Sequence, residues 1–274
     1  MEFRKLGSSD IEVSKICLGT MTYGNQNTES EGHEQMSYAL ENGVNFFDTA
    51  ELYAVPSAPD TQGKTELIMG TWFKKYGKRK DVILATKIAG PSPNLGFIRP
   101  NLGFDRAQIH TALENSFKRL QTDYVDLYQL HWPERKTNFF GKLGYVHSEN
   151  EQWEDNFMEI LETMDDLVKE GKIRHWGISN ETPWGMMHHL QMSAVTGKSR
   201  IVSIQNPYNL LNRSYEVGLA EMSIREKVGL LAYSPLAFGL LSGKYHNNTA
   251  REDARLHRFK VMSRYNSDNS YKAT

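Results

Sequence analysis

The chain has 274 residues and carries 32 Lys and Arg against 33 Asp and Glu, which gives a formal charge of −1 at pH 7 with His neutral. Its 39% hydrophobic and 24% charged residues are typical of a globular protein and exclude a wholly disordered chain or a fibrous repeat. The balanced charge offers no basic surface for nucleic acid or an anionic membrane. We therefore expect one domain over residues 1–274 with a large core and a small-molecule partner.

The single cysteine, Cys17, excludes a disulfide within the chain and a zinc site built from cysteines, and it is typical of a reducing compartment. Residues 1–15 mix charged and apolar side chains and lack the apolar run of a signal peptide. The uncharged stretch Gly229–Gly243 contains Pro235 and is shorter than the ~20 residues that a membrane helix needs. These features predict a cytoplasmic protein without a membrane segment.

The first predicted element is a β-hairpin. Phe3–Leu6 and Ile11–Ser14 are short runs that flank a Gly-Ser-Ser-Asp sequence at residues 7–10, and those residue types favour a turn. Because the hairpin precedes the repeating part of the chain, we expect it to plug one end of a barrel.

From Ile16 to about Leu236, short apolar runs rich in β-forming residues alternate with amphipathic helical patterns. This alternation is typical of βαβ units and predicts a parallel sheet. The seven predicted strands are Ile16–Gly19, Val44–Asp48, Val82–Lys87, Val125–Leu130, Ile173–Ile178, Val202–Gln205 and Leu230–Tyr233. The spacing of apolar residues predicts helices at Gln35–Asn42, Arg106–Leu120 and Asn156–Lys169, packed on the outside of the sheet.

The connections between these elements are informative as well. Gly43 and Gly171 each follow a predicted helix, where a residue in the left-handed conformation ends a helix at low cost. Two long loops, Ala89–Phe104 and Pro133–Asn150, follow the carboxyl ends of predicted strands. Active sites of parallel barrels are built at that end, so both loops are expected to shape a substrate pocket.

Most of the apolar strands stop at a polar or ionisable residue. These residues are Asp48, Lys87, His131, Ser179, Asn180, Gln205, Tyr233 and Ser234. In a parallel barrel all strand ends of one polarity lie on one face, so side chains about 40 positions apart converge on one cavity. One such residue would mean little, because every strand must end somewhere, but a whole set indicates a functional site.

Asp48, Lys87 and His131, together with Tyr53 five residues after Asp48, form a coherent proton-donor site. A tyrosine hydroxyl, with an ordinary pKa of about 10, is a weak acid near neutrality unless its surroundings favour the phenolate. Lys87 beside Tyr53 is expected to do so, and Asp48 to keep Lys87 charged. His131 is expected to hydrogen-bond the substrate oxygen and to orient a carbonyl toward Tyr53.

The same residues also have structural explanations. In one alternative, Asp48 and Lys87 form an ion pair that only closes the end of the barrel. In another, His131 is a structural histidine held by hydrogen bonds, and Tyr233 only packs against its neighbours. Trp132 and Tyr23 are candidates for the wall of a substrate pocket. His188 and His189 lie in a predicted helix, are expected at the surface, and have no third ligand at metal-binding spacing.

The strand-end motifs resemble those of the aldo-keto reductases. The matching motifs, in chain order, are Gly19-Thr-Met, Asp48-Thr-Ala-Glu-Leu-Tyr53, Leu84-Ala-Thr-Lys87, Val125-Asp-Leu-Tyr-Gln-Leu-His131, Ile173-Arg-His-Trp-Gly-Ile-Ser-Asn180, Gln205-Asn-Pro-Tyr208 and Ala232-Tyr-Ser-Pro-Leu236. They reach from the start of the chain to about Tyr245 in the family's order and spacing. His131-Trp-Pro and Phe140-Gly-Lys-Leu-Gly-Tyr145 make the chain most similar, within that family, to the bacterial Tas-type NADP(H)-dependent reductases.

The resemblance implies a (β/α)8 TIM barrel that moves hydride between NADP(H) and a carbonyl or alcohol. It implies Tyr53 as general acid, Asp48 and Lys87 as its tuning pair, and His131 as the residue that orients the carbonyl. The implied cofactor-binding residues are Gly19, Thr20 and Met21 along the nicotinamide ribose, Ser179, Asn180 and Gln205 at the carboxamide, Tyr233 against the ring, Ser234, Leu236, Gly239 and Lys244 along the pyrophosphate, and Asp48. No metal is required, and no Gly-x-Gly-x-x-Gly motif follows a strand to indicate a Rossmann site.

The sequence departs from the family's pattern at its end. Thr274 falls where the seventh helix would be, so we expect a barrel without its final strand and helix and with open edges that favour association. The loop that contacts the adenosine 2′-phosphate in the family would lie beyond Thr274. A chain that continues further, a truncated product and completion by another chain are all compatible with this. The alternative function is a nucleotide-sensing or regulatory subunit, or an inactive remnant, on the same fold.

Overall fold

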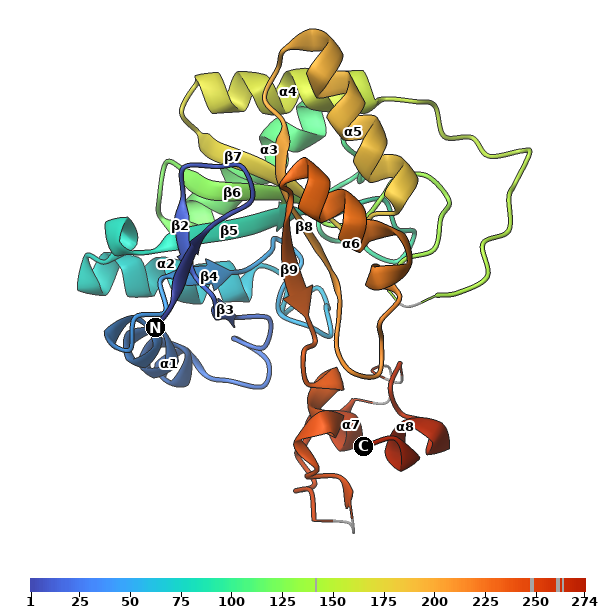
Figure 1. Cartoon of the computed structure of the whole chain (residues 1–274). Helices are drawn as coiled ribbons and strands as arrows, with labels where there is room; N and C mark the ends of the chain where they lie inside the picture. Colours follow the sequence, from blue (N-terminus) through green and yellow to red (C-terminus); the bar gives the residue numbers. More distant parts are fainter. Residues whose placement is uncertain (141, 247–248, 260–261, 263) are drawn as a thin grey trace.

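The computed structural model describes residues 1–140, 142–246, 249–259, 262 and 264–274, so Gly141 of the second long loop lies outside the described residues. Seven parallel strands form one curled sheet in which each strand pairs with the next in the sequence (Figure 1). The strands are β3 (Cys17–Gly19), β4 (Phe46–Asp48), β5 (Ile83–Ile88), β6 (Val125–Leu130), β7 (Ile173–Ser179), β8 (Ile201–Pro207) and β9 (Gly229–Tyr233). The predicted strands are confirmed, and the sheet is an open barrel of βα units with β3 and β9 at its edges.

Six helices cover the outer face of this sheet (Figure 1). They are α1 (Glu29–Glu41), α2 (Lys64–Tyr76), α3 (Arg106–Leu120), α4 (Phe157–Lys169), α5 (Pro183–Thr196) and α6 (Tyr215–Glu226). The three helices given ranges from the sequence are confirmed, although α1 begins earlier because Thr28 and Glu31 form a reciprocal capping box. Gly43 and Gly171, which follow α1 and α4, have φ angles of 82° and 73°, as their positions predict.

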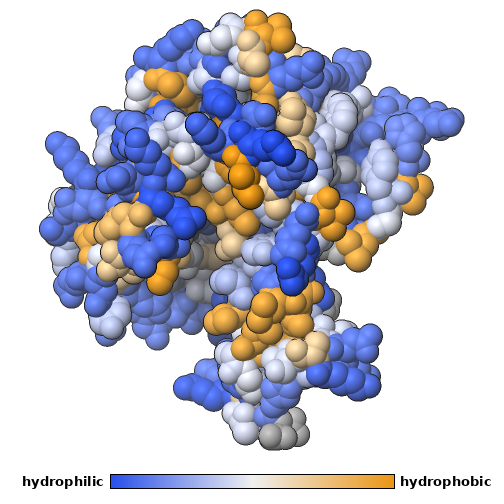
Figure 2. Space-filling model, in the orientation of Figure 1, coloured by the Kyte–Doolittle hydropathy of each residue, from blue (hydrophilic) through white to orange (hydrophobic). Residues whose placement is uncertain are grey.

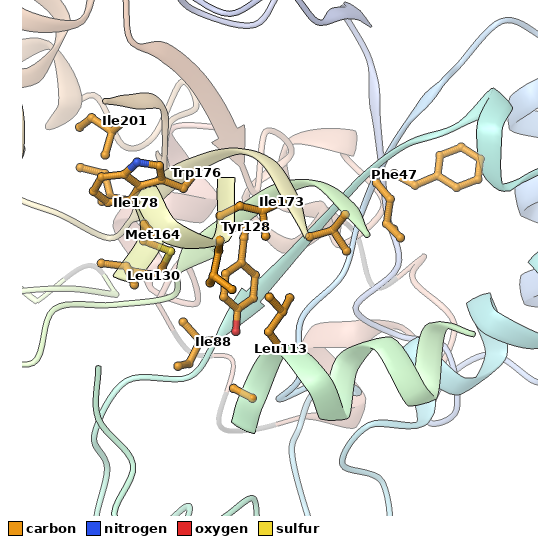
Figure 3. Packing of buried hydrophobic residues seen from close by; sticks show 14 of the residues in the cluster. Phe47, Ile88, Leu113, Tyr128, Leu130, Met164, Ile173, Trp176, Ile178 and Ile201 are labelled. Atoms are coloured by element: carbon orange, nitrogen blue, oxygen red, sulfur yellow. The ribbon is translucent and has the colours of Figure 1, made fainter. Parts of the chain in front are cut away.

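The main core lies between the sheet and these helices. In Figure 3, Tyr128 of β6 points toward Leu113 of α3, and Met164 of α4 lies beside Leu130 of β6 and below Trp176 of β7. All five are at most 5% exposed, and burial of one such side chain contributes roughly 1.5–3 kcal/mol. Because side chains alternate along a strand, the neighbours of these residues point the other way, into the barrel.

The hairpin forms the floor of the barrel. Strand β1 (Phe3–Lys5) pairs antiparallel with β2 (Glu12–Ser14), as the turn residues predict. Leu6, Ile11 and Val13 are buried against the inward-facing Phe46 and Leu127 at the amino end of the sheet. The hairpin therefore closes the end opposite the predicted site, and the expectation of a plug is confirmed.

A separate layer follows β9 at the carboxyl end of the chain, at the bottom of Figure 1. It contains the 3₁₀ helix η2 (Ala237–Ser242), α7 (Arg255–Arg258) and α8 (Asp268–Lys272). Leu240, Tyr245 and Tyr265 form its small core, to which Met21 and Val55 contribute from the loops after β3 and β4. Figure 2 shows apolar surface gathered over this layer and beside β9. No helix in the described ranges is long and apolar enough to cross a membrane.

Candidate active site

The strand alternation that builds the core also aims polar side chains into the barrel. Lys87 of β5 and Gln129 of β6 are register partners, and both are completely buried on the inner side of the sheet. Asp48 ends β4 beside them, and His131 follows β6 directly. Side chains that are far apart in the sequence thus meet at the carboxyl ends of neighbouring strands.

The Lys87 ammonium is the centre of this group. Its Nζ lies 2.6 Å from Oδ2 of Asp48, 2.8 Å from the carbonyl oxygen of Thr49 and 3.2 Å from the hydroxyl of Tyr53. An ammonium has three N–H donors, so each donor of Lys87 has one partner. The predicted contact between Tyr53 and Lys87 is therefore present, and Asp48 supplies the opposite charge.

Burial and charge act in opposite directions on this pair. Burial by itself lowers the pKa of Lys87, but Asp48 outweighs it and the pKa is raised above its ordinary value. Burial raises the pKa of Tyr53, although the Lys87 charge lowers it. Lys87 therefore acts on the phenol in the expected direction, but burial outweighs it and the pKa of the free Tyr53 stays above its ordinary value. Tyr53 carries its proton at neutral pH, and Lys87 carries its charge.

Two amides hold the other oxygen of the Asp48 carboxylate. Gln205 donates from Nε2 to Oδ1 over 2.9 Å, and Gln129 donates to the same oxygen over 3.3 Å. The sequence predicted Gln205 only as a cofactor contact, and it did not indicate Gln129 at all. Asp48 is thus oriented by β6 and β8 as well as by its own strand.

His131 lies on the other side of Tyr53. The two ring centroids are 5.6 Å apart with the planes at 80°. Burial, and after it the Lys87 charge, hold the pKa of His131 well below its ordinary value, so the imidazole is neutral. Within the part of the chain that the structure describes, its Nδ1 makes no hydrogen bond. A neutral ring of this kind can donate to or accept from a ligand oxygen.

Most residues expected around the nicotinamide converge beside this group. Asn180 donates from Nδ2 to the carbonyl oxygen of His131 over 2.9 Å and accepts at Oδ1 from the Tyr233 hydroxyl over 2.6 Å. Ser179 donates to the carbonyl oxygen of Gln205 over 2.8 Å. These four predicted residues therefore share one hydrogen-bonded cluster next to His131.

The predicted residues after β3 divide between two places. Gly19 is the register partner of Asp48, and the Thr20 hydroxyl donates to the Asp48 carbonyl oxygen over 2.8 Å. Met21 instead packs into the carboxyl-terminal layer, and its carbonyl oxygen accepts a hydrogen bond from Val55. Gly19 and Thr20 thus lie beside Asp48, whereas Met21 lies between that cluster and the carboxyl-terminal layer.

The predicted pyrophosphate residues follow β9 in an unusual stretch of backbone. Ser234 and Gly239 have φ angles of 54° and 96°, in the left-handed region that exposes backbone N–H groups in a concave turn. A Cβ on Gly239 would lie 3.1 Å from Nζ of Lys244, so the glycine makes room for the lysine. Leu236 is 55% exposed beside them. A cation next to such a turn has the chemistry of a phosphate site.

This arrangement of strand ends agrees with one protein family. Residues 15–272 match the model of the aldo/keto reductase family. The chain belongs to the aldo/keto reductase family. It is therefore an oxidoreductase by descent, and its curled sheet with a hairpin floor is a barrel of that family without the last strand.

Individual relatives in the aldo/keto reductase family support this membership. Protein tas of Escherichia coli strain K12 is 49% identical over 279 residues, which cover 100% of this chain and 79% of that protein. The aldo-keto reductase YhdN of Bacillus subtilis strain 168 is 36% identical over 248 residues, 89% of this chain and 65% of its own length. An aldo-keto reductase of Babesia bovis is 39% identical over 196 residues, 67% and 69% of the two chains. The predicted similarity to Tas-type proteins is confirmed.

The wall of this aldo/keto reductase site contains further aromatic residues. Trp132 is buried with its ring centroid 4.9 Å from that of His131 and 5.7 Å from that of Phe140, and its Nε1 donates to Pro91. Trp132 thus joins both long loops at the site. Tyr23, the other aromatic candidate, packs in the main core instead.

One polar residue, His189, lies away from its predicted place. His189 is only 3% exposed and packs against Phe157 and Trp176, so its expected surface position is wrong. The His189 ring contributes an apolar face to the core there. Because His188 and His189 are adjacent in the sequence, the pattern did not distinguish the buried one from its neighbour. Among the described residues no group of three or more His, Cys, Asp or Glu is placed to hold a metal ion.

Three charged residues near the site were not predicted. Arg264 donates to the Tyr233 hydroxyl over 3.3 Å from the carboxyl-terminal layer. Glu51 and Arg99 form a buried ion pair with Nη1 of Arg99 and Oε1 of Glu51 3.1 Å apart. Glu51 lies inside the motif from Asp48 to Tyr53, which was a usable signal, whereas Arg99 lies in an irregular loop without one.

Proposed function

We propose that the chain reduces an aldehyde or ketone to the alcohol with NADPH, and that Tyr53 is the general acid. The contact that supports this best is the Lys87 ammonium, which lies 2.6 Å from Asp48 and 3.2 Å from the Tyr53 hydroxyl. Such a buried cation is placed to stabilise the phenolate that forms when Tyr53 gives up its proton. The roles of the four residues follow from this placement.

The residues that would hold the cofactor fit its chemistry. Lys244 beside Gly239 offers a charge and an open backbone turn to the pyrophosphate. Asn180, Ser179 and Gln205 carry the donors and acceptors that a carboxamide needs, and the Tyr233 ring lies beside them. Gly19 ends β3, and Thr20 and Met21 follow it, where the ribose of the cofactor would lie. NADPH, when bound there, supplies the hydride that reduces the carbonyl carbon.

The protein residues supply the proton and the orientation. The neutral His131 imidazole hydrogen-bonds the carbonyl oxygen and holds it near the Tyr53 hydroxyl. Tyr53 donates its proton to that oxygen as negative charge develops, and Lys87 stabilises the phenolate that remains. Asp48 keeps Lys87 charged throughout. The products are the alcohol, the oxidised cofactor and the Tyr53 phenolate, which takes up one proton from solvent before the next turnover.

The setting of the reaction follows from the same proposal. Reduction by NADPH suits a reducing cytoplasm, which agrees with the single cysteine, Cys17. We propose that residues 1–274 act as one barrel domain on small carbonyl compounds, and that the open edges β3 and β9 allow association with a second chain.

Tyr53→Phe tests the proposal. The variant keeps the ring and removes the proton, so we expect kcat for aldehyde reduction to fall about 10²- to 10⁴-fold with little change in NADPH affinity. Tyr38→Phe on the exposed face of α1 is the matched control. Turnover retained by Tyr53→Phe would reject the general acid. NADPH binding by the unaltered chain without turnover on a panel of carbonyls would instead favour a nucleotide sensor.

A further inference from the structure

A buried ion pair lies directly behind the catalytic tyrosine. Glu51 stands two residues before Tyr53 on the loop that follows β4, and Arg99 comes from the long loop after β5. Their side chains are 2% and 5% exposed. Nη1 of Arg99 lies 3.1 Å and 3.5 Å from the two oxygens of Glu51, and Nη2 lies 3.4 Å from the carbonyl oxygen of Ala89.

Glu51 joins the loop that carries Tyr53 to the end of β5, at Lys87 and at Ala89. Its backbone N–H donates to the carbonyl oxygen of Lys87 over 3.2 Å. Its Oε1 accepts from the N–H of Ala89, two residues further along, over 2.5 Å. Gln62 donates to the Glu51 carbonyl oxygen over 2.6 Å. The segment that carries Tyr53 is thus held against the strand end that carries Lys87.

Other charged or titratable groups face Glu51 from the neighbouring helices and strands. They are Glu66 of α2, Arg119 of α3 and the hydroxyl of Tyr128 on β6, besides Arg99. Glu66 and Arg119 pair with each other at 2.7 Å. Arg99 is therefore the direct counter-charge of Glu51, and its loss would leave a buried carboxylate without a charged partner.

The same pair determines where the loop after β5 lies. Arg99 bonds to the Ala89 carbonyl oxygen at the start of that loop, and Pro91 accepts from Nε1 of Trp132, which packs on His131. The loop is therefore joined to the catalytic group at two points, through Arg99 and through Trp132. A shift of Arg99 would move one wall of the pocket and the backbone before Tyr53 together.

We infer that Glu51 and Arg99 are positioning residues, whose ion pair holds Tyr53 within reach of Lys87 and fixes the wall of the substrate pocket. This inference rests on the proposed function, because it concerns the same general acid. Neither residue touches a reacting atom. Their effect on the reaction is exerted through the distance between the Tyr53 hydroxyl and the Lys87 ammonium.

Kinetics of matched variants test this inference. We expect Arg99→Met and Glu51→Gln each to lower kcat 10- to 100-fold while the NADPH dissociation constant stays within about twofold. Arg99→Lys should recover part of kcat, and the double variant should lose less than the product of the two single losses. Arg106→Met, which breaks the exposed pair of Arg106 with Asp166, is the control and should leave kcat unchanged.

A spectroscopic measurement separates this inference from the proposed function. With tyrosine labelled by ¹³C at Cζ, and the Tyr53 signal assigned from Tyr53→Phe, Arg99→Met should shift that signal and its titration midpoint. If the Tyr53 signal shifts in Arg99→Met but the unaltered chain reduces no carbonyl, the proposed function is refuted and the positioning role of Arg99 stands. An unmoved signal and unchanged kcat in a variant with lowered thermal stability would overturn the inference. Arg99→Lys and Glu51→Asp serve the same test if Arg99→Met does not fold.

Discussion

Gln205 donates from Nε2 to Oδ1 of Asp48 over 2.9 Å, and this bond joins β8 to β4 across the interior of the curled sheet. The second oxygen of Asp48 accepts from Lys87. One carboxylate therefore links the ammonium beside the tyrosine to a residue in the amide cluster around Asn180. A substitution in the amide cluster should therefore alter the contact between Asp48 and Lys87.

Gln129→Met should reveal that dependence without altering a predicted cofactor contact. Gln129 is completely buried and donates to the same Asp48 oxygen as Gln205 does. Its loss removes a hydrogen bond to a charged group, and we expect kcat to fall roughly tenfold with unchanged NADPH affinity. Steady-state kinetics and a fluorescence titration measure the two quantities. Gln191→Met on the exposed side of α5 is the control, and an equal loss there would contradict the role of Gln129.

The free energy of unfolding should depend on pH because Glu51 titrates. Burial, only partly offset by Arg99, raises the pKa of the Glu51 carboxyl from 4.5 to about 7. The folded chain then binds more protons than the unfolded chain between these values, so the contribution of Glu51 to stability is present below pH 4.5 and is lost as the pH rises to about 7.

Glu51→Gln removes this titration. The unfolding free energy of the unaltered chain, relative to the variant, should therefore decline by roughly 3 kcal/mol as the pH rises through this window. Urea denaturation at a series of pH values measures the difference. A difference that stays constant with pH would show that Glu51 is ionised throughout. Glu221→Gln, at an exposed carboxylate, is the control.

Gly7→Ala should destabilise the barrel floor. Gly7 has a φ of 57°, and a Cβ there would lie 2.0 Å from the carbonyl oxygen of Val202. Gly77, after α2, has a φ of 65° but has no atom within 4 Å of such a Cβ. We expect Gly77→Ala to cost about 1–2 kcal/mol from backbone strain alone and Gly7→Ala clearly more. Chemical denaturation of both variants compares them, and equal losses would mean that the hairpin shifts to relieve the contact.

The strands and the cluster around Lys87 could be predicted because both depend on local patterns. Each strand is a short apolar run, and Asp48, Lys87 and His131 lie where such runs end, so a parallel sheet necessarily gathers them. Tyr53 follows Asp48 closely enough to reach the same place. The net acidity of its phenol could not be predicted, because it depends on the degree of burial, which only the packed structure provides.

Other features depended on tertiary packing. Helix α2 was not predicted; it begins after Gly63 without a side-chain cap, and Met69, Trp72 and Phe73 are buried on it in the main core. Arg99 lies in a loop without periodicity, and its contact with Glu51 arises from the path of that loop. The sequence therefore predicted the cluster around Lys87 and missed the buried pair of Glu51 and Arg99 beside it.

Lys244→Met should weaken NADPH binding if the turn at Gly239 holds the pyrophosphate. The lysine stands over the ring of Tyr245 at 5.3 Å, and Lys75 stands over the ring of Tyr76 on α2 at 5.0 Å, so Lys75→Met is a matched control for the loss of a charge above a ring. We expect the NADPH dissociation constant to rise roughly tenfold for Lys244→Met, about 1.4 kcal/mol, and to stay unchanged for Lys75→Met. Because a charge–phosphate contact is screened by salt, the difference should shrink as ionic strength increases. Equal affinities at low salt would place the pyrophosphate away from Lys244.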